Sequence, residues 1–265
     1  MRRSVRNPMK LLLHACCGPC SLEPTRILRA AGHDLALYYT NSNIAPASEY
    51  AHRLGTLRTW AGNEGLPVLE GPYAPGAWEA SAGRVGESAL EAAGGDVLRC
   101  ATEAPLREAR CRACYRLRFE EAARSAAERG FDAVGTTLSV SPYQFIDVIR
   151  EELERAAAHA GVDAHFEDYR PFYDEAARRS RAMGMYRQNF CGCRFSEAEA
   201  AAERAQRKRQ RVAEREAKAA AHADERAAEE AARATKRAER QAYAEKQAKK
   251  RAALKALRGQ ERSDG

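Results

Sequence analysis

Short apolar segments alternate with helical patterns along most of the chain, and this alternation limits the possible folds more than any other feature. Four segments have the apolar character of strands: residues 11–15, 35–40, 66–69 and 132–137. Helical patterns occupy residues 24–31, 47–62, 105–129 and 143–160. Strands separated by helices usually form a parallel sheet with helices on its faces. The sequence therefore predicts an α/β fold with a Rossmann-like, mostly parallel sheet and functional residues at the carboxyl ends of the strands.

Residues 71–104 interrupt this alternation and are rich in Gly, Ala and Glu. We expect a loop or short helices there, inserted before the long helix at 105–129. Pro105 suits the first turn of that helix, and Gly130 suits its C-terminal cap.

The C-terminal part of the chain lacks the residues that build a core. After Phe195, the apolar residues larger than alanine are Val212, Tyr243, Leu254 and Leu257. From Glu197 onward, 19 lysines and arginines face 13 aspartates and glutamates, so this part carries +6 of the formal charge of +7. Acidic and basic residues four apart favour a helix. We predict a domain at 1–196 and a basic helical or partly disordered tail at 197–265.

Two interpretations of the tail remain open at this point. A helix of this composition can be solvated on all sides, or it can lie along the phosphates of a nucleic acid.

Seven of the eight cysteines fall into three tight groups, and Cys100 stands apart. The groups are Cys16, Cys17 and Cys20; Cys111 and Cys114; Cys191 and Cys193. The N-terminal region offers only the aliphatic run 11–13, far short of a secretion signal or a membrane span, so we expect a cytoplasmic protein with no membrane partner. In a reducing compartment, clustered thiols more often bind metal or perform redox chemistry than form structural disulfides.

Cys111 and Cys114 form a C-x-x-C pair on a predicted helix, where two sulfurs can approach one metal. Cys16 and Cys17, at the end of the first strand, would complete the four thiolates that either zinc or a 4Fe-4S cluster requires. Cys20 is either a further metal ligand or a small buried hydrophobe.

Cys191 and Cys193 are separated by a single glycine. Glycine permits the tight backbone that a small disulfide needs, and a strained disulfide is easily reduced. These thiols are therefore a redox pair, two more metal ligands, or inert. We expect Cys100 to have no role in the chemistry, and His14 to pack or form a hydrogen bond at the strand end.

Five segments in this order resemble the cobalamin-independent epoxyqueuosine reductase family. They are LLLHACCGPCS (11–21), NIAPASEYAHRL (43–54), RCRACYRLRF (110–119), TTLSVSPYQ (136–144) and GMYRQNFCGC (184–193). The resemblance implies an oxidoreductase of tRNA modification. Its expected reaction is removal of the epoxide oxygen from epoxyqueuosine at the wobble position of tRNA, which gives queuosine.

The resemblance also implies roles for the cysteines. Cys16, Cys17, Cys111 and Cys114 correspond to the ligands of a 4Fe-4S cluster, and Cys191 with Cys193 to a redox-active disulfide. Cys20 stands where some relatives have aspartate, in a region associated with an additional mononuclear iron. The basic tail lies outside the resemblance.

Several residues near these motifs are candidates for contact with the tRNA. Tyr186, Arg187, Gln188 and Asn189 directly precede the redox pair, and Tyr115 or Tyr186 is a candidate general acid. Arg112, Arg116 and Arg118 either contact RNA or are ordinary helix arginines. The electron donor stays unidentified, and the rival interpretation is a noncatalytic, zinc-stabilised RNA-binding protein.

Overall fold

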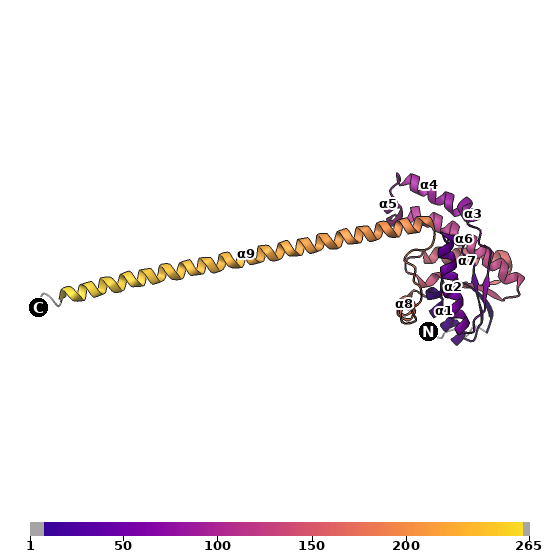
Figure 1. Cartoon of the computed structure of the whole chain (residues 1–265), viewed down its shortest axis with the longest axis horizontal. Coiled ribbons are helices and arrows are strands. Elements are labelled where there is room, and N and C mark those ends of the chain that lie inside the picture. The colour runs from indigo at the N-terminus through magenta and orange to yellow at the C-terminus, as the bar shows by residue number, and fades with distance from the viewer. Residues whose placement is uncertain (1–7, 262–265) are drawn as a thin grey trace. The chain divides into compact units, whose positions relative to one another are not determined.

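The computed structural model describes residues 8–261, without the side chains of residues 224, 225 and 252–261. Five parallel strands form one sheet in the order β3-β2-β1-β4-β5, with helices packed on it (Figure 1). The strands are β1 (Lys10–His14), β2 (Asp34–Tyr39), β3 (Val68–Glu70), β4 (Ala133–Thr136) and β5 (Asp163–His165). The predicted α/β fold with a parallel sheet is confirmed.

The fifth strand was not predicted from the sequence. β5 is only three residues long, contains one apolar residue between Asp163 and His165, and pairs with β4 at the edge of the sheet. A segment of three residues is too short to show an alternating pattern. Its extended form depends on pairing with the neighbouring strand rather than on its own residues.

Strand β1 lies at the centre of the sheet and separates two hydrophobic cores. Successive side chains of a strand point to opposite faces. Leu11 and Leu13 pack with helices α1 (Gly18–Ala30) and α2 (Ala47–Asn63). Leu12 packs on the other face with α6 (Ala104–Glu128) and α7 (Ile146–Ala160).

Helix α1 begins at Gly18, earlier than the predicted residue 24. Cys17 caps this helix, since its sulfur accepts a hydrogen bond from the amide of Cys20 at 3.4 Å. Pro19 lies in the first turn, where its missing N–H costs nothing. The predicted start was wrong because the sequence pattern did not reveal that a cysteine provides the cap.

The inserted region before α6 forms short helices, one of the two forms expected for it. It contains α3 (Pro75–Trp78), the π-turn η1 (Glu79–Gly83), α4 (Arg84–Ala92) and α5 (Val97–Thr102). Three further elements were not predicted: η2 (Leu138–Val140), η3 (Arg170–Phe172) and α8 (Tyr173–Ala182). Trp78 packs with Cys114, Cys193 and Phe195 in a small cluster beside the sheet.

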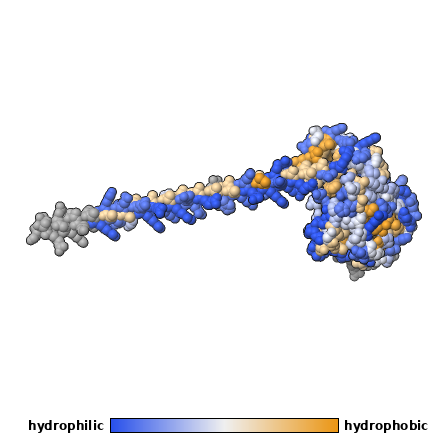
Figure 2. All heavy atoms as spheres, viewed as in Figure 1, coloured by the Kyte–Doolittle hydropathy of each residue, from blue (hydrophilic) through white to orange (hydrophobic). Residues whose placement is uncertain are grey.

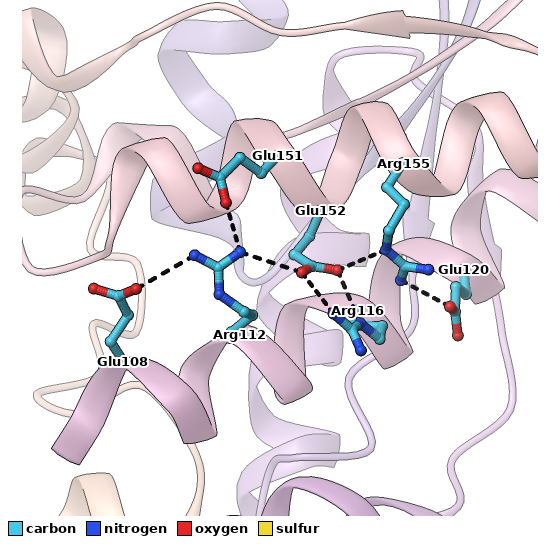
Figure 3. A network of polar contacts seen from close by, with 7 residues as sticks. All are labelled: Glu108, Arg112, Arg116, Glu120, Glu151, Glu152 and Arg155. Carbon is cyan, nitrogen blue, oxygen red and sulfur yellow. Dashed lines mark hydrogen bonds and ion pairs between the residues drawn. The ribbon is translucent and has the colours of Figure 1, made fainter. Parts of the chain in front are cut away.

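Helices α6 and α7 are joined by a network of ion pairs centred on Glu152 (Figure 3). The Glu152 carboxylate is buried and accepts two hydrogen bonds from Arg116 at 3.0 Å and one from Arg155 at 3.0 Å. Arg112 also reaches Glu152, at 3.4 Å. Burial raises the pKa of Glu152, but these arginines outweigh that effect and lower it. The network holds in place the helix that carries Cys111.

Helix α9 (Arg194–Glu261) forms most of the predicted tail and confirms that it is helical. The chain divides into two compact units, one ending at Arg204 and the other beginning at Ala205. The boundary after Ser196 stays a prediction, because α9 continues through it. Among the described residues, no helix has the length and apolar character needed to cross a membrane.

The first turns of α9 belong to the first unit and are tied to α6 there. Arg110 donates to both carboxylate oxygens of Glu199, at 2.6 and 2.9 Å, and both side chains are buried. Burial lowers the pKa of Arg110, but this paired geometry overcomes the effect and keeps the guanidinium charged.

Substitution Glu199→Ala would leave the Arg110 charge buried and unpaired. We expect a loss of about 3 to 5 kcal/mol in the free energy of unfolding, measured by urea denaturation. The control is Glu229→Ala, which removes an exposed pair with Arg233 and should cost less than about 0.5 kcal/mol. Equal losses for the two variants would contradict this account of the junction.

Candidate metal and redox site

One side of the site is formed by residues at the carboxyl ends of three neighbouring strands. Cys16 follows β1, Asn41 follows β2 and Thr137 follows β4. The Thr137 hydroxyl lies 3.3 Å from the amide and 3.6 Å from the sulfur of Cys16. Asn41 donates to the carbonyl of Ala15 at 2.9 Å. The sheet topology thus fixes the position of the first cysteine from two sides.

Cys16, Cys17 and Cys20 form a group that can bind a metal. Their sulfurs all lie within 4.8 Å of one another, and those of Cys16 and Cys17 are 3.8 Å apart. Hydrogen bonds from Cys17 and Cys20 lower the pKa of Cys16 well below its usual value. Burial raises the pKa of Cys17 to about 12. One sulfur of the group is therefore stabilised as a thiolate by its two neighbours.

Helix α6 contributes Cys111 and Cys114 and, one turn after Cys114, the buried Arg118. Burial lowers the pKa of Arg118, but the sulfurs of Cys114, Cys191 and Cys16 act against burial and raise it. The same guanidinium lowers the pKa of each of these three thiols. One cysteine from each of the three sequence groups therefore lies within electrostatic range of one arginine.

The guanidinium of Arg118 has nitrogens without a hydrogen-bond partner, and these indicate what kind of group fits beside it. Its Nη2 donates to Asn41 Oδ1 at 2.5 Å, whereas Nε and Nη1 are buried without a hydrogen-bond partner. A buried cation with two free donors is costly unless an anion lies nearby. Four cysteine thiolates around an iron–sulfur cluster carry net negative charge, so the donor set and the arginine both fit such a group.

Cys191 and Cys193 lie on a segment pinned by residues from α2. Arg53, 1% exposed, donates to the carbonyls of Cys191 at 2.8 Å and Phe190 at 3.4 Å. Arg53 Nε donates to Glu49 Oε1 at 2.7 Å. The ion pair between Arg53 and Glu49, one helical turn apart, thus fixes the backbone of the C-G-C segment.

Gly192, between the two cysteines, has φ 138°, a conformation that favours glycine. A Cβ there would lie 2.9 Å from Ile44 and 3.0 Å from the amide nitrogen of Asn43. The backbone also passes close by, since the Gly192 carbonyl accepts from Ala45 N at 3.0 Å. The glycine is required both by conformation and by space.

The thiols of Cys191 and Cys193 are free, and Cys193 is buried while Cys191 is partly buried. Cys191 and Cys193 are not joined in a disulfide. Burial raises the pKa of both, while Arg118 and Arg53 act in the opposite direction on Cys191, and Arg110 on Cys193. Cys191 and Cys193 also raise the pKa of Cys111, although burial is the larger cause there. The second and third cysteine groups are thus electrostatic neighbours.

The candidate substrate residues occupy different environments. Tyr115 is 1% exposed and donates to Gln144 Oε1 at 2.6 Å, an oxygen that also lies 4.0 Å from the Cys191 sulfur. Burial raises the pKa of Tyr115 well above its usual value, so the phenol stays protonated. Tyr186 donates to Glu49 at 2.7 Å and stacks on His52 with ring centroids 3.8 Å apart.

The three residues after Tyr186 divide between surface and interior. Arg187 and Asn189 are exposed. Gln188 contacts Cys17 and lowers its pKa slightly against the effect of burial, and Gln188 Oε1 is buried without a partner. Gln188 is thus the one of the three that reaches a candidate ligand.

Cys100 and His14 are the two residues for which we expected no part in the sulfur chemistry, although His14 lies close enough to Cys16 and Arg118 for both to affect its pKa. The Cys100 sulfur is buried against the carbonyl of Ala89 at 3.5 Å. His14 contacts Thr136 Oγ1 at 3.0 Å, and burial lowers its pKa to about 3. A neutral imidazole at the strand end agrees with a packing role.

Sequence reasoning missed several residues that build the site. Arg118 was treated as one of three equivalent helix arginines, but Arg112 and Arg116 pair with Glu152. Asn41 and Thr137 follow strands, so their position at carboxyl ends was a usable signal. Gln144 ends the TTLSVSPYQ segment, but its role was not predicted, since only folding brings it to Tyr115 and Cys191.

Comparison with known proteins agrees with this arrangement. The model of the family described as "Epoxyqueuosine reductase QueH" matches residues 11–199. A protein of that name from Acinetobacter baylyi is 32% identical over 195 residues, covering 72% of this chain and 81% of that protein. One from Thermotoga maritima is 29% identical over 197 residues, covering 71% and 91%. With a cysteine group at the end of β1 and a family match over most of its length, the chain belongs to the epoxyqueuosine reductase QueH family.

Proposed function

We propose that this protein reduces epoxyqueuosine to queuosine at the wobble position of tRNA. Family membership supports the reaction, since the relatives are named for it. The observation that carries the proposal is the group of Cys16, Cys17 and Cys20 sulfurs within 4.8 Å of one another. The electrostatic effect of Cys16, Cys114 and Cys191 on the buried Arg118 adds support from the other two cysteine groups. A structural zinc site would not call for the additional thiols of Cys191 and Cys193, so the zinc-stabilised RNA-binding alternative is not favoured.

We assign Cys16, Cys17, Cys111 and Cys114 as the residues that would hold a 4Fe-4S cluster. When bound, such a cluster supplies electrons one at a time. Arg118 lies where it would compensate the negative charge of the four thiolates. Cys20, within 4.8 Å of Cys16 and Cys17, is the candidate ligand for an additional mononuclear iron.

The proposed reaction needs two electrons and two protons for each epoxide. Both C–O bonds of the epoxide break, a C=C double bond forms, and the oxygen leaves as water. Oxidation of the Cys191 and Cys193 thiols to a disulfide releases two electrons and two protons, which balances the reaction. An unidentified donor would then restore the dithiol, a step that a strained and reducible disulfide favours.

The substrate must present its base to this buried chemistry. Bases of a single-stranded anticodon loop can be splayed out and stacked on aromatic side chains. Tyr186, stacked on His52, and the exposed Arg187 and Asn189 are the residues that we assign to base and phosphate contacts. Tyr115 is the candidate proton donor beside Cys191, with Gln144 orienting its hydroxyl. We place the reaction in the cytoplasm, where thiols stay reduced.

The reaction itself is tested by anaerobic incubation of the iron-loaded protein with epoxyqueuosine-bearing tRNA and a reductant. Nucleoside mass analysis should show the loss of one oxygen atom. The variants Cys191→Ser and Cys193→Ser should keep their iron but lower turnover by roughly 100-fold or more, because a serine hydroxyl cannot store electrons. Undiminished turnover in Cys191→Ser would remove the dithiol from the mechanism.

The ligand assignment is tested by iron and acid-labile sulfide content after anaerobic reconstitution. Cys111→Ser should lose most of its iron and sulfide, because three thiolates hold a cluster poorly. The matched control is Cys100→Ser, another buried cysteine that should retain full loading. Loss of loading in both variants, or in neither, would contradict the assignment.

The role of Arg118 is tested through the reduction potential of the loaded protein. A nearby positive charge favours the reduced state, so Arg118→Gln should shift the potential to more negative values by roughly tens of millivolts. Arg118→Lys should shift it less, since the charge is kept. Arg124→Gln, an exposed arginine on the same helix, should leave it unchanged. An unchanged potential in Arg118→Gln would show that the arginine does not face the cluster.

A further inference from the structure

The part of α9 beyond Arg204 carries most of its positive charge on one side. Eleven exposed basic residues between 205 and 251 recur at spacings that place them on the same side of a helix. These residues, called the basic stripe below, are Arg207, Lys208, Arg211, Arg215, Lys218, Arg226, Arg233, Lys236, Arg237, Arg240 and Arg251. At 3.6 residues per turn they fall in an arc of about 120°.

The rest of the helix circumference has a different character. Alanine is the most frequent residue there, as at Ala213, Ala220 and Ala231, and Figure 2 shows a row of apolar residues along α9 beside hydrophilic ones. Of the eight acidic residues between 205 and 251, Glu225 and Glu229 fall within the arc by their position on the helix, and Glu229 contacts Arg233 at 3.5 Å. The other six, among them Glu216 and Glu239, fall outside it together with four basic residues. The excess of positive charge within the arc gives the helix one face suited to an extended anion.

The composition of residues 205–251 argues against the other partners of an exposed helix. A helix that lies on a membrane needs large apolar residues opposite its charges. A coiled coil needs them in every heptad. In this described segment only Val212 and Tyr243 are large and apolar, and they are 45% and 66% exposed. Neither a lipid surface nor a partner helix finds a continuous apolar seam here.

We propose that the basic stripe binds the phosphate backbone of the tRNA on which the enzyme acts. A helix rises about 5.4 Å per turn, so the stripe presents roughly one cation per turn to a chain of regularly spaced phosphates. Binding of this kind releases counterions and depends strongly on salt, and it carries no sequence information. The identity of the RNA rests on the proposed function, in which the first unit selects the modified base.

The need for such a surface follows from the first unit itself. Arg112 and Arg116 are engaged in ion pairs with Glu152, and Arg118 is buried, so these arginines already have partners within the protein or lie in its interior. Residues 8–196 carry little net charge, whereas the tail from Glu197 carries +6. The long-range attraction for a polyanion therefore comes from the tail.

The test compares two full-length variants that each lose three positive charges. The first neutralises the stripe with Arg211→Gln, Arg240→Gln and Arg251→Gln. The control neutralises nearby cations off the stripe with Arg209→Gln, Lys246→Gln and Lys249→Gln. Glutamine and the replaced residues have similar helix propensity, and circular dichroism checks that helicity is kept.

Affinity is measured for tRNA lacking the modified base, over a range of salt concentrations. The stripe variant should bind at least about tenfold more weakly and show a log–log salt slope smaller by about two to three. The control variant should lose less than about threefold. Equal weakening of the two variants, or no weakening in either, would overturn the proposal.

A second set of binding measurements distinguishes RNA from an anionic lipid surface as the partner of the basic stripe. Both variants and the parent are tested on phosphatidylglycerol vesicles, and binding there that exceeds binding to tRNA would overturn the assignment to RNA. Because the tRNA used carries no epoxide, the result does not depend on the chemistry. Failure of the parent protein to remove oxygen from epoxyqueuosine would instead count against the proposed function alone.

Discussion

A buried guanidinium with unsatisfied donors is the constraint on which the rest of the site depends. Arg118 donates to Asn41 and has the Cys114 sulfur as a hydrogen-bonding neighbour, while Nε and Nη1 find no further partner in an interior where an unpaired cation is costly. The groups that compensate it are sulfurs of Cys16, Cys114 and Cys191. Each comes from a different part of the chain, so the charge of one arginine links the three cysteine groups.

The parallel sheet explains how segments so distant in sequence meet. All strands end at the same edge, where Cys16, Asn41 and Thr137 follow β1, β2 and β4. Helix α6 packs on the sheet face that Leu12 lines, and Glu152 of α7 holds it there. The segment with Gly192 closes the site from the other side through Arg53. These contacts help to position the cysteine sulfurs. None of the side chains of Asn41, Thr137, Glu152 and Arg53 is itself a candidate metal ligand.

The two units of the chain divide the work that a tRNA-modifying enzyme must perform. The first unit carries little net charge, and charged side chains such as Arg110 and Glu199 form buried ion pairs there. In the second unit, the charged side chains that the structure describes are exposed along α9. Our proposals therefore assign the chemistry and the long-range attraction to a polyanion to different parts of one chain.

The sequence by itself determined the elements with strong local patterns and the identity of the cysteine motifs. β1, β2, β4, α2, α6 and the helical tail were all predicted, because their apolar spacing or composition acts locally. The start of α1 at Gly18 depends on a local contact, the Cys17 cap, which the apolar pattern alone does not reveal. The edge strand β5 and the role of Arg118 were decided only in the tertiary structure. A strand of three residues depends on its neighbour, and a buried arginine on sulfurs distant in the chain. No window of sequence contains those partners, whereas the folded sheet brings them together.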